Sequence, residues 1–358
     1  MKRGMILLCD SDRVYLGRLH GYLRERIRMP LEWLDFTDVS YLPARAEGPE
    51  KTVLVIAERD ARQADLTLYE NILLLTEQAS YDGGENANAL RTGRHTEIRT
   101  VSRYSRASEI ADRLLELLGD VIVFPSDETD GGFPTTVVGY YSPLGRCMQT
   151  CASIAAGQLL AAQSRTLFIG FDAFPVTALN AEDTGADLSD LLYYFGCDKS
   201  RLNVWIQRAK KRMGMLEYIP PAASIHRTQG VDGAEWVALI RAICKQEAPD
   251  YLLLDLSGQT PGLFDILSVC HMIYTITGHD AQDAAKIEGY KHWLVESGSE
   301  DILQKTVFCR MPKGCRLPAS AEMLGGSALA AYLIRNGLVP EKQMPRGSCR
   351  DERRAAAV

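Results

Sequence analysis

Short apolar runs alternate with amphipathic stretches along the chain, which is the pattern of α/β folds with parallel sheets. In the first third, apolar runs predict strands at 5–9, 31–36, 52–57, 71–76 and 97–102. A second series predicts strands at 135–142, 166–172, 251–257, 272–277 and 305–311. The second series is almost continuously apolar, as expected of strands that are covered on both faces.

The amphipathic stretches between these runs predict helices, notably at 12–26 and 105–118. The second of them has a serine and Glu109 near its start, which is typical of a capped helix N-terminus. The basic run "QRAKKRMGM" at 207–215 predicts a solvated helical face. The alternative interpretation is a surface that meets acidic partners or DNA.

One stretch in the chain is typical of a linker. The segment "PSDETDGGFP" at 125–134 combines proline, glycine and acids without an apolar period. We therefore predict a first domain at 1–120, a linker at 121–134 and a second domain at 135–340. The last residues, 341–358, lack a core pattern and predict a disordered tail.

Composition and charge narrow the class of protein. The chain has 358 residues, and its formal net charge of −6 argues against broad nucleic-acid binding. No signal peptide fits the N-terminus, and no apolar stretch approaches the ~18 residues of a membrane span. The nine cysteines contain no C-x-x-C pair, which favours reduced thiols in a cytoplasmic protein. The histidines lack metal-binding spacing, so we expect no metal beyond Mg²⁺.

Polar residues follow the strands of the first domain. Asp10 and Asp12 come after the first strand, Glu58 ends the third, Thr76 closes the fourth and Arg103 follows the fifth. This arrangement resembles the response-regulator receiver, a flavodoxin-like fold. The resemblance implies an acid cluster for Mg²⁺, a phosphoacceptor, a hydroxyl and a cation at the carboxyl edge of the sheet, where ligands of such sheets gather.

Two departures from the receiver pattern argue against phosphorylation. Glu58 stands where receivers carry aspartate, and its extra methylene moves the attacking oxygen out of line. Arg103 stands in place of lysine and is a planar fork instead of a compact point charge. We therefore expect a degenerate receiver site in a docking or dimerisation module; the simplest alternative is a solvated acidic edge.

The second domain begins with a sequence typical of a phosphate-binding loop. A strand is followed by "LGRCMQT" and then by an alanine-rich helix. Such loops work because backbone N–H groups and a helix N-terminus converge on the phosphates. The candidate nucleotide-binding residues here are Gly145, Arg146, Cys147, Met148, Gln149, Thr150 and Cys151.

Two positions of this loop depart from the usual pattern. Gln149 stands where a lysine would stabilise the transferring phosphoryl group. Met148 stands where glycine would adopt a left-handed backbone without the ~1–2 kcal/mol penalty of other residues. Thr150 remains as a potential Mg²⁺ ligand, and Arg146 is the residue that could supply a substitute cation.

Further candidates follow the next strands. Asp172 ends the strand after the loop, Asp255 ends the strand "YLLLDLS", and Gly258 is placed for close approach to a γ-phosphate. This ordered series resembles the MinD/ParA group of P-loop ATPases over about 200 residues. Gly170 departs from that group, which usually has an acid two residues before Asp172.

Within that group the chain most resembles TadZ/CpaE-type pilus-assembly proteins, on the phrases "YSPLGRC", "DLSDLLYYF" and "DYLLLDLSG". The resemblance implies a receiver-like domain joined to a MinD/ParA-like P-loop NTPase domain with a mostly parallel sheet. It implies a cytoplasmic homodimer that helps place pilus or secretion machinery, with recruitment to a cell pole. ATP with Mg²⁺ held by Thr150 and Asp255 is allowed, but we expect hydrolysis to be lost.

Two other functions stay open at the level of sequence. One is a working ParA/MinD-type ATPase switch in which Arg146 or a residue of a partner chain replaces the lost lysine. The other is a two-component regulator with an unusual output domain.

Overall fold

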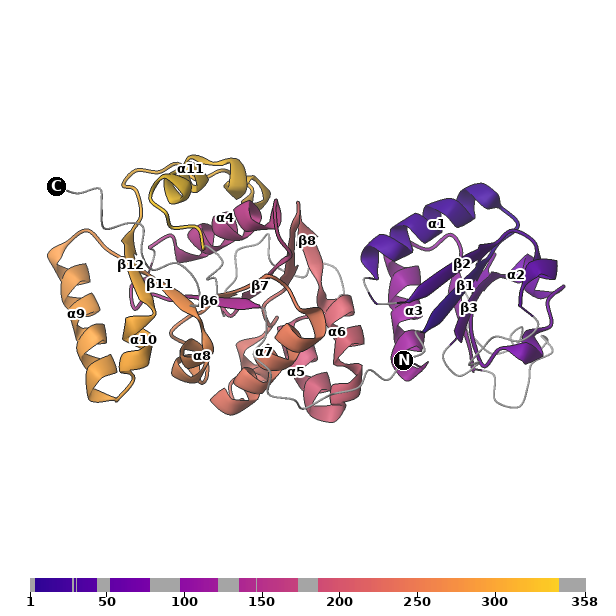
Figure 1. Cartoon of the computed structure of the whole chain (residues 1–358), viewed down its shortest axis with the longest axis horizontal. Coiled ribbons are helices and arrows are strands. Elements are labelled where there is room, and N and C mark those ends of the chain that lie inside the picture. Colours follow the sequence, from indigo (N-terminus) through magenta and orange to yellow (C-terminus); the bar gives the residue numbers. More distant parts are fainter. Residues whose placement is uncertain are drawn as a thin grey trace, which may run out of the picture. The chain divides into compact units, whose positions relative to one another are not determined.

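The computed structural model describes residues 4–27, 29, 31–43, 52–77, 97–121, 135–145, 147–172 and 186–340. The chain divides into two compact units, one formed by residues 1–128 with 194–208 and the other by residues 129–193 with 209–358. Each unit is built around its own sheet (Figure 1). Almost all of the expected linker and the whole of the expected tail lie outside the described residues, so those boundaries stay predictions.

The first unit contains a five-stranded parallel sheet in the order β2-β1-β3-β4-β5. Its strands are β1 (Met5–Cys9), β2 (Glu32–Phe36), β3 (Thr52–Ala57), β4 (Asn71–Thr76) and β5 (Glu97–Ser102). Every one of them lies where an apolar run predicted it. This is the strand order of flavodoxin-like doubly wound sheets; a relationship to receivers stays a prediction.

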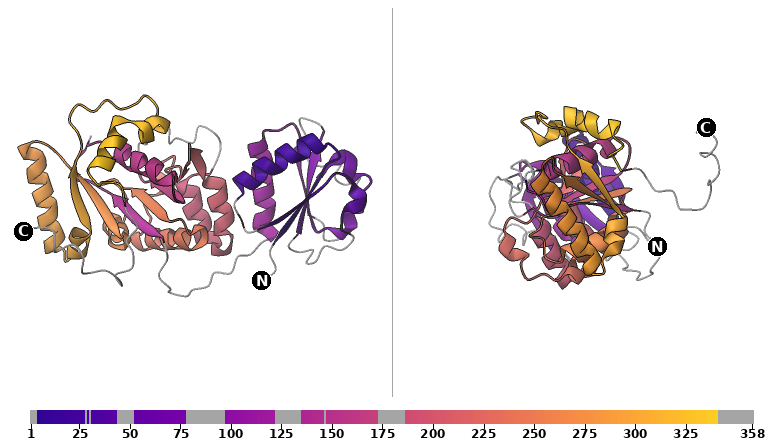
Figure 2. Two further views of the ribbon diagram at one scale, coloured as in Figure 1. Left: turned by 45° about the horizontal axis from the view of Figure 1, so that its top comes forward. Right: turned by 90° about the vertical axis from the view of Figure 1, so that its left-hand side faces the viewer.

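Helices cover both faces of this first sheet (Figure 2). Helices α1 (Arg13–Arg26) and α3 (Ala107–Val121) pack on one face, where Leu19, Leu23 and Leu114 share a core with Ile6 and Leu8. The short helix α2 (Glu58–Ala61) lies on the other face. The central strand β3 is buried along its whole length, which explains its unbroken apolar sequence.

The second unit contains a seven-stranded sheet in the order β12-β11-β6-β10-β7-β9-β8. Its strands are β6 (Thr136–Tyr140), β7 (Thr166–Gly170), β8 (Lys211–Met213), β9 (Leu216–Ile219), β10 (Tyr251–Asp255), β11 (Met272–Thr277) and β12 (Thr306–Arg310). All pairs are parallel except β8 with β9. The expected α/β class with a mostly parallel sheet is therefore confirmed.

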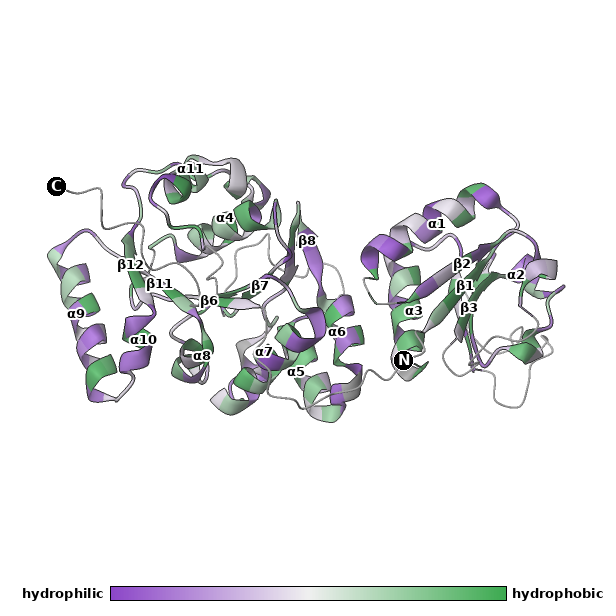
Figure 3. Ribbon diagram, in the orientation of Figure 1, coloured by the Kyte–Doolittle hydropathy of each residue, from purple (hydrophilic) through white to green (hydrophobic). Residues whose placement is uncertain are grey.

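Helices also lie on both faces of the second sheet (Figures 1 and 2). Helix α4 (Gln149–Ala161) and helix α11 (Ala328–Arg335) share one core cluster on one face. Further helices of this unit are α7 (Gly233–Glu247), α8 (Leu263–Val269), α9 (Ala281–Glu296) and α10 (Glu300–Gln304). The end of α5 (Leu188–Cys197) and most of α6 (Leu202–Ala209) fall within residues 194–208, which belong to the first unit. Figure 3 shows apolar strands between helices that carry both polar and apolar residues.

The basic run at 207–215 does not lie on one helix, so that prediction was wrong. Helix α6 ends at Ala209, and Gly214 turns the chain with a φ of +63° between β8 and β9. Lys210 is buried, and its Nζ lies 2.6 Å from Glu247 Oε2 and 3.4 Å from Glu217 Oε2. The helix therefore does not continue through this run, because Lys210 pairs with Glu247 and the following residues form the β8–β9 hairpin.

Helix α4 is fixed to the C-terminal part of the second unit by one amide. Gln158 Nε2 donates to the carbonyl of Ala321 at 3.0 Å, and Gln158 Oε1 accepts from the backbone N–H of Gly325. Both partners belong to η8 (Ala321–Gly326), the 3₁₀ helix that precedes α11. Within the described ranges, none of the helices has both the length and the apolar character needed to cross a bilayer.

Lys210→Met should destabilise the second unit strongly. The change removes the cation that faces the buried Glu247 carboxylate, and breaking such a pair costs about 3 kcal/mol or more. Urea unfolding of the full chain measures the loss. Lys211→Met, one residue along, should change stability by less than about 0.5 kcal/mol. Equal losses in the two variants would show that the pairing of Lys210 is not the cause.

Candidate functional site

The predicted phosphate loop connects the centre of the second sheet to the N-terminus of α4. Strand β6 lies between β11 and β10 and ends at Tyr140, and the helix begins at Gln149. Met148, the residue before the helix, has φ 64° and ψ 23°, a left-handed conformation without a side-chain cap. The loop therefore keeps the backbone turn that glycine allows, although a methionine occupies it at a cost of ~1–2 kcal/mol.

Gln149 turns its side chain back into the loop. Its Nε2 lies 2.8 Å from Asp255 Oδ1, 2.8 Å from the carbonyl oxygen of Leu256 and 3.1 Å from that of Tyr140. The amide thus joins the carboxyl ends of β6 and β10 to the first residue of α4. A neutral donor therefore occupies the loop position at which the phosphate-loop pattern has a lysine.

Asp255 is the centre of this cluster. Its side chain is buried at the end of β10, and burial raises its pKa from 3.8 to about 6. Hydrogen bonds from Gln149, Thr150 and Ser153 oppose that rise, whereas the negative charge of Asp172 adds to it. The fold therefore brings together Gln149, Thr150 and Asp255, three of the residues that the sequence singled out, and adds Ser153, which it did not.

The thiol of Cys147 is also turned into the loop. Its Sγ donates to the carbonyl of Leu144 at 3.5 Å and contacts the Ser142 hydroxyl and the backbone N–H of Gln149. Burial raises the pKa of this thiol above its usual value, so the neutral form is favoured. Burial likewise raises the pKa of Cys151 in the first turn of α4.

The remaining candidates lie around this cluster. Gly145 and Gly258 are exposed, and an added Cβ would meet no atom within 4 Å at either position. Asp172 follows β7 and lines a small cavity together with Phe171 and Trp236. Arg146 lies outside the described residues. Among the residues that the structure describes, no group of three histidine, cysteine or acidic side chains is arranged to hold a metal ion.

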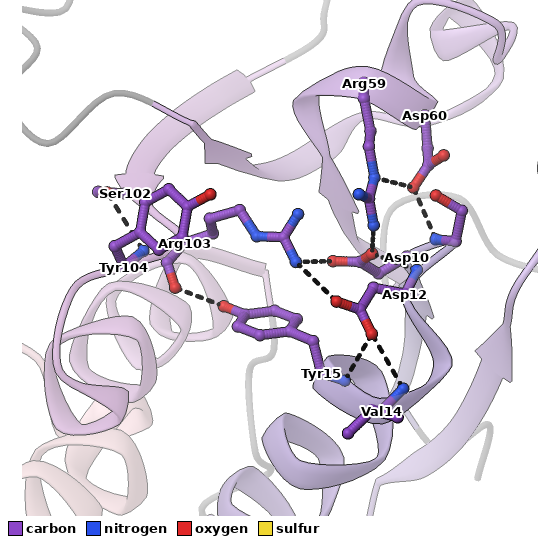
Figure 4. A network of polar contacts seen from close by, with 10 residues as sticks. Asp10, Asp12, Val14, Tyr15, Arg59, Asp60, Ser102, Arg103 and Tyr104 are labelled. Carbon is purple, nitrogen blue, oxygen red and sulfur yellow. Dashed lines mark hydrogen bonds and ion pairs between the residues drawn. The ribbon is translucent and has the colours of Figure 1, made fainter.

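The candidates of the first unit are only partly brought together (Figure 4). Arg103 Nη2 lies 3.4 Å from Asp10 Oδ2 and 3.7 Å from Asp12 Oδ2. Glu58 is turned elsewhere: its carboxylate lies 3.0 Å from Arg62 Nη2 and accepts from the N–H of Glu77 at 3.2 Å. The Thr76 hydroxyl donates to the carbonyl of Val101 at 3.4 Å.

Two residues of this edge were missed from the sequence. Arg59 Nη2 lies 2.5 Å from Asp10 Oδ1, and Asp60 Oδ2 accepts from the N–H of Ser11 at 2.8 Å. Both follow Glu58 directly in the short helix α2. Successive residues of a helix point about 100° apart, so Arg59 and Asp60 cannot share the direction of Glu58. The sequence feature that could have identified them is the charged triplet "ERD", which directly follows β3.

Several solved structures are similar to part of this chain. A ParA family ATPase from Chlorobium tepidum TLS is 15% identical, with 54% of this chain and 81% of that chain covered and a TM-score of 0.42. The septum site-determining protein MinD complexed with Mg-ADP, from Pyrococcus horikoshii OT3, is 15% identical, with 57% and 85% covered and a TM-score of 0.40.

A chain of the MinC:MinD cell division protein complex from Aquifex aeolicus is 17% identical. The alignment covers 56% of this chain and 89% of that chain, with a TM-score of 0.37. No family model and no curated protein matches the sequence. These similarities concern the arrangement of elements; the chemistry of this site depends on its own residues.

Asp255→Asn should stabilise the protein in a pH-dependent way. Because the pKa of Asp255 is raised to about 6 in the fold, the stability that its protonated form contributes is lost as pH rises through about 6. Asparagine does not ionise, so the variant should gain about 3 kcal/mol over the wild type near pH 8 and nothing below about pH 4. Urea unfolding across this pH range measures the gain.

The matched control is Glu288→Gln, which neutralises a side chain that is 70% exposed. Its effect on the free energy of unfolding should be small and nearly constant over the same range. If Asp255→Asn behaves like this control, burial does not raise the pKa of Asp255.

Proposed function

We propose that the chain is a ParA/MinD-like protein that does not hydrolyse nucleotide and acts as a scaffold or localisation factor for Tad-type pilus assembly or secretion. One observation carries the loss of hydrolysis: the Gln149 amide is bonded to Asp255 and to two strand-end carbonyls. The pilus role rests on the resemblance of the loop and strand phrases to TadZ/CpaE-type proteins.

Hydrolysis needs charges that Gln149 and Gly170 do not supply. Phosphoryl transfer is catalysed largely by positive charge placed on the phosphate oxygens and by an oriented nucleophile. An amide at position 149 contributes no net charge, and Gly170, beside Asp255 in the sheet, offers no acid. The Asp255 carboxylate is already engaged by Gln149, Thr150 and Ser153.

A bound nucleotide is compatible with part of the site. A left-handed Met148 directly before the N-terminus of α4 supports an anion-binding loop, and Thr150 lies beside Asp255. Thr150 and Asp255 would hold Mg²⁺, which would supply the positive charge near the phosphates. The Gln149 amide and the Cys147 thiol would have to move out of the loop and give up their hydrogen bonds before phosphates could enter. We therefore infer that nucleotide binds weakly and is not hydrolysed.

The scaffold would act through contacts between proteins. We infer a cytoplasmic homodimer that engages components of the pilus or secretion machinery and is recruited with them to a cell pole. The first unit would contribute a docking or dimerisation surface. Pilin and secretion-ATPase genes beside this one would support the assignment.

The wild-type protein should release no phosphate from ATP, and Gln149→Lys with Met148→Gly should raise its affinity for Mg²⁺-ATP about tenfold or more. The added ammonium group would face the phosphates, and glycine would relieve the left-handed backbone. A fluorescent ATP analogue measures affinity, and a phosphate-release assay measures turnover.

A charge-matched control is Gln163→Lys, an exposed position at the far end of α4. It should leave nucleotide affinity unchanged. Hydrolysis by the wild type that Asp255→Ala abolishes would favour the ATPase switch. A stable adduct formed on the first unit with acetyl phosphate would favour the two-component regulator.

A strain that lacks this chain should lose Tad-type pili, and the Asp255→Asn variant should restore them as well as the wild type does. The reason is that the proposed role uses contacts and not turnover, and the variant keeps the size of the side chain and one acceptor oxygen for the Gln149 amide. Electron microscopy of surface pili measures the result. Normal piliation of the deletion strain would refute the pilus role, and failure of Asp255→Asn alone would refute the loss of hydrolysis.

A further inference from the structure

The carboxyl edge of the first sheet holds a buried aspartate between two arginines (Figure 4). The Asp10 side chain is 1% exposed. Its Oδ1 accepts from the N–H of Asp12 at 2.8 Å and from Arg59 Nη2 at 2.5 Å. Its Oδ2 lies 3.4 Å from Arg103 Nη2. A carboxylate this deeply buried is stable as an anion only where positive charge compensates for the lost hydration.

Two more carboxylates lie at the same edge. Asp12 caps α1 by accepting from the N–H groups of Val14 and Tyr15, both at 3.1 Å. The hydrogen bond from Tyr15 is the largest effect that lowers the pKa of Asp12. Asp60 Oδ2 lies 3.7 Å from Arg59 Nε. Carboxylates grouped in this way repel one another unless cations stand between them.

The two arginines are held in different ways. Arg103 is 6% exposed at its side chain, and its guanidinium lies over the Tyr15 ring at 4.4 Å, while the Tyr15 hydroxyl donates to the Arg103 carbonyl at 2.8 Å. Arg59 is 39% exposed at its side chain and comes from α2, directly after β3. Arg103 is thus part of the core, whereas Arg59 reaches the carboxylates from the rim.

We propose that Arg59 is a built-in counter-cation of the first unit. Its guanidinium supplies within the chain the positive charge that Asp10 and Asp60 require, so the carboxyl edge needs no divalent cation to stay folded. Glu58 is turned toward Arg62, and Arg59 is the arginine of α2 that faces Asp10. The proposal concerns the first unit alone and does not depend on the function proposed for the second.

Hydrogen–deuterium exchange of the full chain tests the proposal, read in peptides that cover β1 and the first turns of α1. Arg59→Met should speed exchange of these amides about tenfold or more, because it leaves Asp10 buried with one cation fewer. Arg62→Met is the control: it removes an exposed arginine of the neighbouring turn and should leave exchange unchanged. Wild-type exchange should be the same in EDTA and in millimolar MgCl₂.

A second variant covers the case in which Arg59→Met does not fold. Asp10→Asn removes the buried charge, so the double variant Arg59→Met with Asp10→Asn should recover most of the wild-type protection. The proposal is overturned if MgCl₂ slows exchange in the wild-type peptides. It is also overturned if Arg59→Met matches Arg62→Met, or if Asp10→Asn restores nothing.

Discussion

The site in the second unit depends on one set of hydrogen bonds. The Gln149 amide makes them to Asp255 and to the carbonyls of Tyr140 and Leu256. Parallel strands end in unpaired carbonyls, and a buried carboxylate at such an end has no water to solvate it. The Gln149 amide donates both to Asp255 and to the Leu256 carbonyl, and it adds a contact to the Tyr140 carbonyl, which also accepts from the N–H of Leu256 at 2.9 Å. These contacts tie the first residue of α4 to the ends of β6 and β10.

Both units treat the acid at the carboxyl edge in the same manner. Asp10 is compensated by Arg59 and Arg103, and Asp255 is satisfied by side chains of α4. In each case side chains of the same unit supply the hydrogen-bond or ion-pair partners of a buried carboxylate. A sheet edge satisfied from within has less to gain from a ligand, because any newcomer must compete with bonds that already exist.

Much of the fold could be predicted from the sequence, because short continuous apolar runs are typical of strands that are buried on both faces of a parallel sheet. The β8–β9 hairpin could not, since its basic residues follow a helical pattern and are fixed by Glu247, far away in sequence. The position of Asp255 beside the loop was expected from strand order. The Gln149 contact spans 106 residues and depends on side-chain direction, which periodicity does not encode. Glu58 illustrates the same limit, because a helix begins at that residue and turns the next two inward.

Gln158 gives α4 a second fixed point, on η8. A helix held near its start by Gln149 and farther along by Gln158 has neither rotation nor axial sliding left as an easy motion. The 3₁₀ helix η8 that leads into α11 is therefore tied directly to α4, although Ala321 follows Gln158 by 163 residues in the chain.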